Sequence, residues 1–494
     1  MASNKIRMTG MVSGMDTESL ITALTSSKKD KVDKAKGEQK KLSWKQDAWK
    51  TMNSKIYSLY SGKLTSMRFS SAYDKKVTTS SSSALSVVAG DGANEGTMSA
   101  KVKSLAKAGY ITGAEIKAAD GSKVTQDTKV TELGIEAGTK MSFTVAGESK
   151  EIEITEDMTM YGLTSKLREA GLNASFDVDN KRLFISAKET GAANDFKFTG
   201  GDVALNKLGL TARSGATRIN GSDAELELNG ATFKSSTNTF KINGSTYTAN
   251  SVTDETITLK TSKDTSGVYD NIKNFFKDYN DTINAMTKAY NADSASKYTM
   301  LTDEMKDVMS DKEVEEWEGK IKDSLLRKDS SLNNILSAMR DVMSQEIEID
   351  GKKYTLADFG IDKQSYITAD PNERYSYHIY GDKDDEIYSG KSDMLNSAIA
   401  ENPELVATFF QELSNKLYDS MSEQMRSTDY SSAYKVYEDK KMQTEYNNYT
   451  KKIAELEEKL TEAENRYYKR FGSMESMLSK LNDSSSSISA LFNM

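Results

Sequence analysis

The chain has 494 residues, of which 28% are charged, and its acidic residues outnumber the basic ones to give a formal net charge of −8. This balance argues against a general nucleic-acid binder, because such proteins carry a basic domain or stripe. Cysteine is absent and His378 is the single histidine, which excludes disulfides, thiolate chemistry and histidine-rich metal sites. No apolar run approaches the roughly 20 residues of a membrane span.

The first 75 residues predict a short irregular leader followed by helix. The basic residues near the N-terminus precede no apolar run, so no cleaved signal peptide is expected. Asp16 is placed to cap a first helix. That helix carries an apolar group near its start: Leu20, Ile21 and Leu24. A lysine-rich stretch over 28–41, expected to be a solvated helix face, leads to a second helix over 44–67. Apolar residues of this second helix fit a seven-residue frame that must be buried against another helix: Trp49, Met52, Ile56 and Leu59.

Residues 78–262 hold 19 of the 30 glycines together with short alternating runs, which predicts a β-rich region. Within it, a hairpin around Gly147, a helix over 158–170 and a second hairpin over 172–187 form a ββαββ module. The strands before and after this module are predicted to pair with each other as an antiparallel sandwich. The module is therefore interpreted as a domain inserted into another domain.

From residue 264 the pattern returns to helix, beginning with an apolar stripe over 268–283 and interrupted by a small β excursion over 347–388. The last predicted helix, over 432–481, has apolar residues at alternating steps of three and four: Tyr446, Tyr449, Ile453, Leu456 and Leu460. Two successive four-residue steps after Ala463 form a stutter, which locally unwinds a coiled coil. A serine run over 484–487 is expected to break the helix.

These patterns predict an α+β multidomain chain. A long helical coiled-coil or bundle stalk from both termini would hold a β-rich head of two small domains, one sandwich-like and one an inserted ββαββ module. The predicted segments are terminal legs at 1–40 and 467–494, stalk at 41–76 and 264–466, a proximal head domain at 77–125 and 214–263, and an inserted head domain at 126–213.

The two ends are expected to pair with each other, since each carries an apolar seam and neither resembles the middle. The regular seams fit packing within one subunit as well as packing between subunits. The outermost residues have the least chain left to pack against, so burial against another molecule is predicted for them: Leu20, Ile21, Leu24, Phe471, Met474, Leu478, Leu481, Leu491 and Phe492.

Local features that could carry chemistry are weak. The glycine-rich loop 90–96 departs from nucleotide-loop spacing, and the acidic loop 382–386 departs from the EF-hand template. His378 lies in an alternating run over 375–380 and is expected to be structural. No catalytic residue, cofactor or metal is predicted, and an assembly or binding protein is favoured. A carbohydrate-active enzyme stays as a distant alternative, because catalytic carboxylate pairs are recognised only by their separation in space.

The chain opens with the motif Gly10-Met-Val-Ser-Gly-Met-Asp16. Further short motifs follow in order at 217–221 with 235–239, then at 275–280, 301–304, 317–318 and 325–327, and finally at 431–434, 439–440, 467–471 and 474–475. Taken in this order, they resemble the flagellar filament cap protein family (flagellar hook-associated protein 2). The first is similar to the family's N-terminal signature, the next pair to the return from the head, the next four to the helices after it, and the last four to the C-terminal helix. Met300 stands where the resemblance leads us to expect proline, a departure that would loosen the turn there.

The resemblance implies a non-enzymatic cap at the distal end of the flagellum. It implies a homo-oligomeric ring of five subunits that lets exported flagellin fold and insert beneath it. The implied partners are further copies of the chain, flagellin, the hook-filament junction protein and an export chaperone, with neither nucleic acid nor a membrane. The implied location is extracellular, reached through the flagellar type III export channel. The alternative is a secreted adhesin whose head, over 78–262, binds host glycan or mucus.

Overall fold

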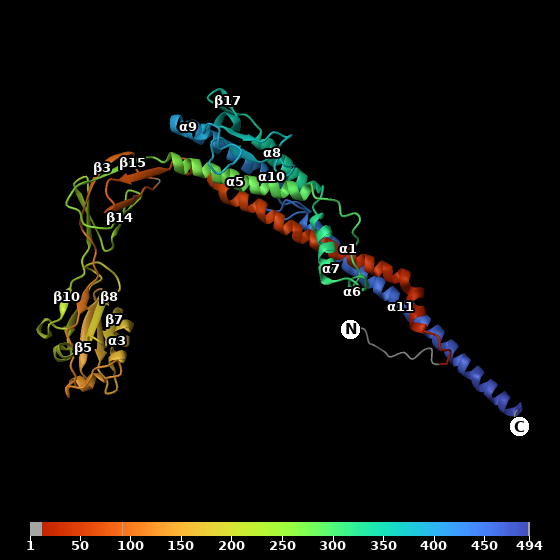
Figure 1. Cartoon of the computed structure of the whole chain (residues 1–494), viewed down its shortest axis with the longest axis horizontal. Helices are drawn as coiled ribbons and strands as arrows, with labels where there is room; N and C mark the ends of the chain where they lie inside the picture. The colour runs from red at the N-terminus through yellow and green to blue at the C-terminus, as the bar shows by residue number, and fades with distance from the viewer. Residues whose placement is uncertain (1–11, 91, 493–494) are drawn as a thin grey trace. The chain divides into compact units, whose positions relative to one another are not determined.

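The computed structural model describes residues 12–90 and 92–492, and the side chains of residues 489–492 lie outside this description. The chain forms two compact units, one of residues 1–73 with 266–494 and the other of residues 74–265 (Figure 1). None of the helices in the described part is both long and apolar enough to cross a membrane. Each unit has its own hydrophobic core and is described by itself.

The first unit is mainly helical and begins and ends with its two longest helices. Its helices are α1 (Thr17–Leu59), a π-helical turn (Tyr60–Leu64), α2 (Thr65–Met67), α5 (Thr265–Tyr290), α6 (Asp303–Asp307), α7 (Asp311–Asp323), α8 (Ser330–Met343), α9 (Met394–Glu401), α10 (Pro403–Gln424) and α11 (Asp439–Phe492). Two short hairpins occupy the predicted β excursion: β16 (Ile347–Ile349) with β17 (Lys352–Tyr354), and β18 (Ile361–Lys363) with β19 (Tyr377–Ile379).

Helix α1 begins where the sequence predicts. The carboxylate of Asp16 accepts a hydrogen bond from the backbone N–H of Ser19 at 3.0 Å, which satisfies one of the free donors of the first turn. The predicted division into two helices is wrong, because α1 runs without a break through the lysine-rich stretch 28–41. Lysines of that stretch find carboxylates on other helices, as in the 2.7 Å contact between Lys36 and Glu457, so their like charges do not interrupt the helix.

A π-helical turn follows α1 and redirects the chain. Gly62 has φ −97° and ψ −108°, outside the helical region, and the Thr65 hydroxyl donates to the carbonyl of Tyr60 at 2.7 Å. The side chain thus satisfies a carbonyl that the widened turn exposes. The Tyr60 ring stacks on Tyr418 of α10 with ring centroids 4.3 Å apart, which holds the turn against the rest of the unit.

The core of the first unit is rich in aromatic side chains. The predicted apolar stripe over 268–283 lies on α5, and its Phe275, Phe276 and Tyr279 are buried. They pack in one cluster with Phe409 and Phe410 of α10 and with residues of α8.

The connection 291–302 is held to its neighbours without a proline. Met300 lies against α1 at Gly37, where a Cβ atom would approach the Met300 Cβ to 2.9 Å. The indole N–H of Trp317 donates to the carbonyl of Thr299 at 2.9 Å. These contacts fix the segment through packing at a position where the resemblance leads us to expect a stiffer residue.

The second unit is built from short strands and two short helices. Its elements are β1 (Lys76–Ser80), β2 (Leu85–Val88), β3 (Gly96–Ser104), β4 (Tyr110–Thr112), β5 (Lys140–Val145), β6 (Glu148–Glu153), α3 (Met160–Glu169), β7 (Leu172–Asp177), β8 (Arg182–Ala187), β9 (Phe196–Gly200), α4 (Asp202–Lys207), β10 (Thr217–Ile219), β11 (Ala224–Leu228), β12 (Ala231–Ser235), β13 (Thr239–Ile242), β14 (Ser245–Ala249) and β15 (Ile257–Lys263).

Strands before and after the predicted insert pair as the sequence indicates. One sheet has the order β1-β15-β3-β11-β12 and another the order β13-β14-β2, and both contribute to one core. A second core lies between the sheets β10-β4-β8-β7 and β6-β5-β9 together with α3. The two predicted hairpins of the insert are present, but they belong to different sheets because β9 pairs with β5 and β4 pairs with β8.

The C-terminal serine run does not end α11, contrary to the prediction. The hydroxyls of Ser484 and Ser487 donate to the carbonyls of Lys480 and Asp483, each at 2.8 Å. A serine that returns its hydroxyl to the preceding turn in this way is compatible with a continuing helix. The backbone of α11 therefore stays helical to Phe492.

Candidate assembly surfaces

The two terminal helices pack against each other in antiparallel fashion (Figure 1). The side-chain amide of Gln39 donates to the Thr450 hydroxyl at 2.6 Å, and Lys36 pairs with Glu457 at 2.7 Å. As residue numbers fall along α1, those of the contacted residues on α11 therefore rise. In this register the regular seam of α11, over 446–460, lies opposite the first half of α1. The second half of α1 packs elsewhere.

The predicted stalk residues accordingly divide between two environments. On α1, Trp49, Met52, Ile56 and Leu59 are buried in the core of the first unit with residues of α5, α8 and α10. On α11, Ile453 is buried, and the remaining seam residues are half-buried: Tyr446, Tyr449, Leu456 and Leu460. Between 443 and 463, every side chain outside this seam except the buried Ala463 is exposed, so α11 presents a single narrow face to its neighbours.

The predicted leg residues also divide. Ile21 is only 3% exposed, whereas Leu20 and Leu24 on the same turns remain open to solvent, Leu24 at 52%. On α11 the structure leaves Phe471, Met474 and Leu478 half-buried and Leu481 exposed. Leu491 and Phe492 lie in α11, but their side chains are outside the described part, as are residues 1–11 of the N-terminal leg, Gly10 of the motif included.

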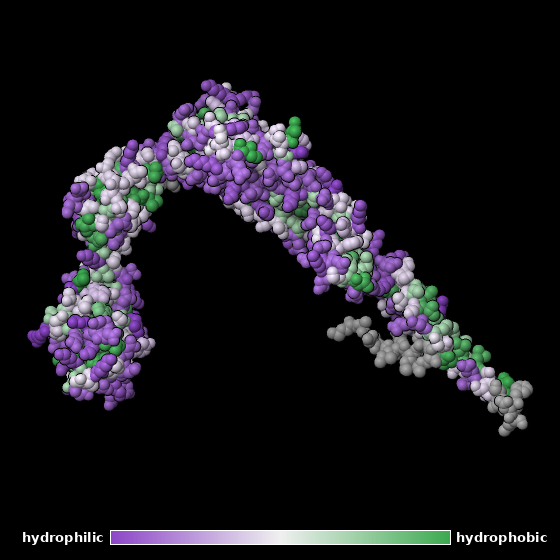
Figure 2. All heavy atoms as spheres, in the orientation of Figure 1, coloured by the Kyte–Doolittle hydropathy of each residue, from purple (hydrophilic) through white to green (hydrophobic). Residues whose placement is uncertain are grey.

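The C-terminal part of α11 carries an exposed apolar face. Met477 and Leu481 are 66% and 65% exposed, and Ile488 is also exposed. Steps of four and seven residues place the three on one side of a helix. Figure 2 shows hydrophobic residues gathered along this end of α11. Three exposed apolar side chains on one side of a helix are a candidate surface for contact with another molecule.

Glu475 is a site residue that periodicity did not single out. Its carboxylate accepts the backbone N–H of Val12 at 2.9 Å and that of Ser13 at 3.3 Å, and the Ser13 hydroxyl donates to its other oxygen. The hydroxyl of Ser13, together with these backbone donors, holds the pKa of Glu475 below its usual range. The only sequence signal was that Ser13 and Glu475 each stand in a motif of the resemblance, at opposite ends of the chain.

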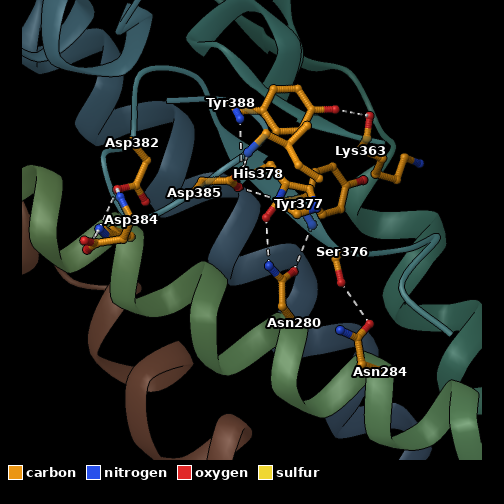
Figure 3. Close-up of polar contacts among 12 residues, drawn as sticks. Asn280, Asn284, Lys363, Ser376, Tyr377, His378, Asp382, Asp384, Asp385 and Tyr388 are labelled. Carbon is orange, nitrogen blue, oxygen red and sulfur yellow. Dashed lines mark hydrogen bonds and ion pairs between the residues drawn. The ribbon is translucent and has the colours of Figure 1, made fainter. Parts of the chain in front are cut away.

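The acidic loop 382–386 makes ion pairs with a lysine of α5 (Figure 3). Lys273 of α5 contacts Asp382 at 2.6 Å and Asp384 at 2.5 Å. Burial of the Lys273 ammonium opposes its charge, but the two carboxylates outweigh burial and raise its pKa. Within the part of the chain that the structure describes, no group of three or more acidic or histidine side chains could hold a metal ion.

His378 lies in β19, where its side chain takes part in hydrogen bonds that hold the strand in place. A 2.5 Å hydrogen bond joins its Nδ1 to the Oδ2 of Asp385, whose other oxygen accepts the backbone N–H of Ile387 at 3.0 Å. Asn280 of α5 fixes the same strand by exchanging two hydrogen bonds with the backbone of Tyr377 (Figure 3). The polar cluster therefore holds the β excursion onto α5.

Terminal helices that pair with each other and leave an apolar face uncovered are typical of a protein that assembles with other chains. A family model described as the C-terminus of flagellar hook-associated protein 2 matches residues 221–483, and one described as the N-terminus of that protein matches residues 13–109. The first alone covers more than half of the chain. The chain therefore belongs to the flagellar hook-associated protein 2 family.

Individual relatives and one solved structure are similar to this chain. Flagellar hook-associated protein 2 of Halalkalibacterium halodurans is 23% identical over 547 aligned residues, which cover 99% of this chain and 100% of the relative. The A-type protein of Pseudomonas aeruginosa is 26% identical over 58% of each chain. The crystal structure of the D1-D2-D3 domains of the flagellar cap protein FliD from Escherichia coli matches with a TM-score of 0.48 and 19% identity, covering 77% of this chain and 97% of that one.

Proposed function

We propose that this chain caps the distal end of the bacterial flagellar filament, as a homo-oligomeric ring of five subunits that lets exported flagellin fold and insert beneath it. Family membership supports a flagellar role, and the observation that carries the assembly role is the uncovered apolar face on α11. The relatives reported above are named as flagellar components, which agrees with a structural role and not a catalytic one.

The terminal legs would attach to filament subunits through this face. Fully burying one large apolar side chain contributes about 1.5–3 kcal/mol relative to leaving it exposed. Met477, Leu481 and Ile488 would therefore supply a modest attraction, part of which is lost when the helix is ordered against a partner. Contacts of this size suit a leg that must attach, release and attach again as the filament grows.

The proposed partners are further copies of the chain, flagellin and the hook-filament junction protein, with an export chaperone for the C-terminal helix before secretion. The proposed location is extracellular, at the distal end of the flagellum. The glycan-binding alternative has no support from the relatives reported above and is not proposed further.

Deletion of the gene tests the proposal. Cells without the protein should secrete flagellin monomers and build no filaments, and the intact gene should restore them. A truncated chain that lacks residues 471–494 should keep the folded second unit but fail to restore filaments. Filaments of normal length in the deletion strain would contradict the capping role.

A further inference from the structure

We infer that Glu475 couples the two ends of the chain, so that the first turns of α1 and the last turns of α11 become ordered and are released together. Glu475 acts here as a positioning residue, since it holds residues 12–16 on α11 and does not itself face a partner. The coupling stands on the contacts within the chain, and only its use in attaching to a filament rests on the proposed function.

The first support is the burial pattern of α11. Between residues 464 and 488, all of which the structure describes with side chains, Glu475 is the only one that is buried, at 9% exposure. A buried carboxylate is unfavourable unless hydrogen bonds replace its water. Here the replacements come from Val12 and Ser13, more than 460 residues away in the chain. The N-terminal turn therefore supplies the hydrogen-bond partners that this carboxylate has in the folded chain.

The second support is a chain of hydrogen bonds from Glu475 into the start of α1. The Ser13 hydroxyl donates to Glu475 and accepts the backbone N–H of Met15 at 3.3 Å. The carbonyl of Met15 in turn accepts the N–H of Thr17, the first residue of α1, at 2.9 Å. Gly14 has φ +68°, in the left-handed region that lets the chain reverse between these contacts. Opening the carboxylate contact thus frees the turn that leads into α1.

The third support is the small amount of apolar packing nearby. The buried residues in the first ten positions of α1 are Thr17, Ile21 and Thr25, of which only Ile21 is a large apolar side chain. The Thr25 hydroxyl donates to the Ile21 carbonyl of its own helix at 2.8 Å, so it adds no bond to α11. Beside the packing of Ile21, the hydrogen bonds of Glu475 are therefore a specific polar link between the two ends.

Hydrogen exchange measured by mass spectrometry on the full chain tests the coupling. In Glu475→Ala, amide exchange should quicken by about three- to tenfold both in residues 17–25 and in residues 464–481, with Glu475→Gln intermediate. Glu462→Gln, at an exposed carboxylate on the same helix, should match the wild type. Exchange in α5 and α10 should stay unchanged in every variant, which shows that the unit remains folded.

Gly14→Ala is the sharper variant, because an added Cβ would meet no atom within 4 Å and acts only through the strained φ. It should quicken exchange in 464–481 of α11 although it changes no residue there. In the double variant Ser13→Ala with Glu475→Ala, the effects should be clearly less than additive. Faster exchange confined to residues 12–16, with α11 at the wild-type rate, would overturn the coupling.

Filament assembly in the same variants separates this inference from the proposed function. If Glu475→Ala shows faster exchange at both ends of the chain and also caps filaments poorly, the coupling of the ends is needed for capping. Coupled exchange with normal filaments would leave the coupling in place and remove its role in capping. A deletion strain with normal filaments would remove the capping role without touching the exchange result.

Discussion

The two ends of the α1–α11 pair differ in what they bury. Towards the core of the first unit, α1 contributes Trp49, whose ring stacks on Tyr437 at 5.1 Å with an interplanar angle of 7°. Towards the free end, it contributes threonines and Ile21. Helix α1 thus passes from an aromatic core to a narrow contact with α11, where Ile21 is its one large buried apolar side chain within the first ten positions. Local stability follows buried apolar contact, so the core end should be firm and the free end should open readily.

Replacing Trp49 should give the largest loss in the free energy of unfolding, because this residue belongs to the well-packed end of α1. Trp49→Ala removes a side chain that is 1% exposed, and large aromatic-to-alanine changes in cores cost about 3–5 kcal/mol. Leu24→Ala, on the free end of the same helix, should change the free energy of unfolding by no more than about 0.5 kcal/mol. Denaturant unfolding of the first unit checks both, and equal losses would contradict the difference between the ends.

Asn53→Ala should have the next largest effect. The Asn53 amide donates to the Tyr434 carbonyl at 3.1 Å and accepts the Val436 N–H at 3.0 Å, so it holds the connection between α10 and α11. A buried backbone group left without a partner costs about 1–3 kcal/mol. The loss should appear in denaturant unfolding and as faster exchange around residue 436. Lys50→Ala, an exposed change on α1, serves as the control, and the same loss there would remove the role of Asn53.

Acidification should weaken the free end before the core end. The folded-state pKa of Glu475 is lowered by Ser13 and Val12, so its contribution is fully present above the unfolded pKa. It is lost as pH falls through the lowered folded value, below the usual range of about 4 for glutamate. The difference in exchange between wild type and Glu475→Gln at the free end should therefore shrink at low pH. A difference that grows on acidification would contradict the assigned ionised state.

Leu481→Ser should have the smallest effect on stability and sharpen the distinction between folding and assembly. Because Leu481 is 65% exposed, the free energy of unfolding should change by less than about 0.5 kcal/mol. Filament length in a complemented deletion strain should nevertheless fall, since a contact surface is lost. Lys480→Ser is the matched control on the neighbouring position. Full capping by Leu481→Ser would argue against this face as the attachment surface.

Local features of the fold could be predicted, and pairings across the chain could not. The cap at Asp16, the stripe on α5 and the seam of α11 all follow from residues within a few turns of each other. The lysine-rich part of α1 finds partners such as Glu457 on another helix, and this pairing cannot be read from the local sequence. The sequence predicts the two hairpins of the insert correctly. The sheet that each hairpin joins is set by β4 and β9, whose short sequences show only a weak strand pattern.

The candidate site shows the same limit. Exposed and buried residues of the legs look alike in sequence, and the antiparallel register decides that Ile21 is covered while Leu24 is open. Glu475 is a charged residue on a charged helix, so periodicity treats it as solvated. Its role depends on donors at residues 12 and 13, which no local pattern connects to it.

The π-helical turn at Tyr60–Leu64 has a consequence for how this helix can vary in length. A π turn contains one residue more than an α turn, and that residue compensates for a rotation of about 100°. Leu59 before the turn and Leu64 and Met67 after it can therefore all be buried. Without Gly62, Leu64 and Met67 would follow Leu59 by four and seven positions, which lie on one face of a regular α-helix. The π turn therefore absorbs one extra residue without moving the buried face, and a chain that lacks this residue could keep the same core with a regular helix.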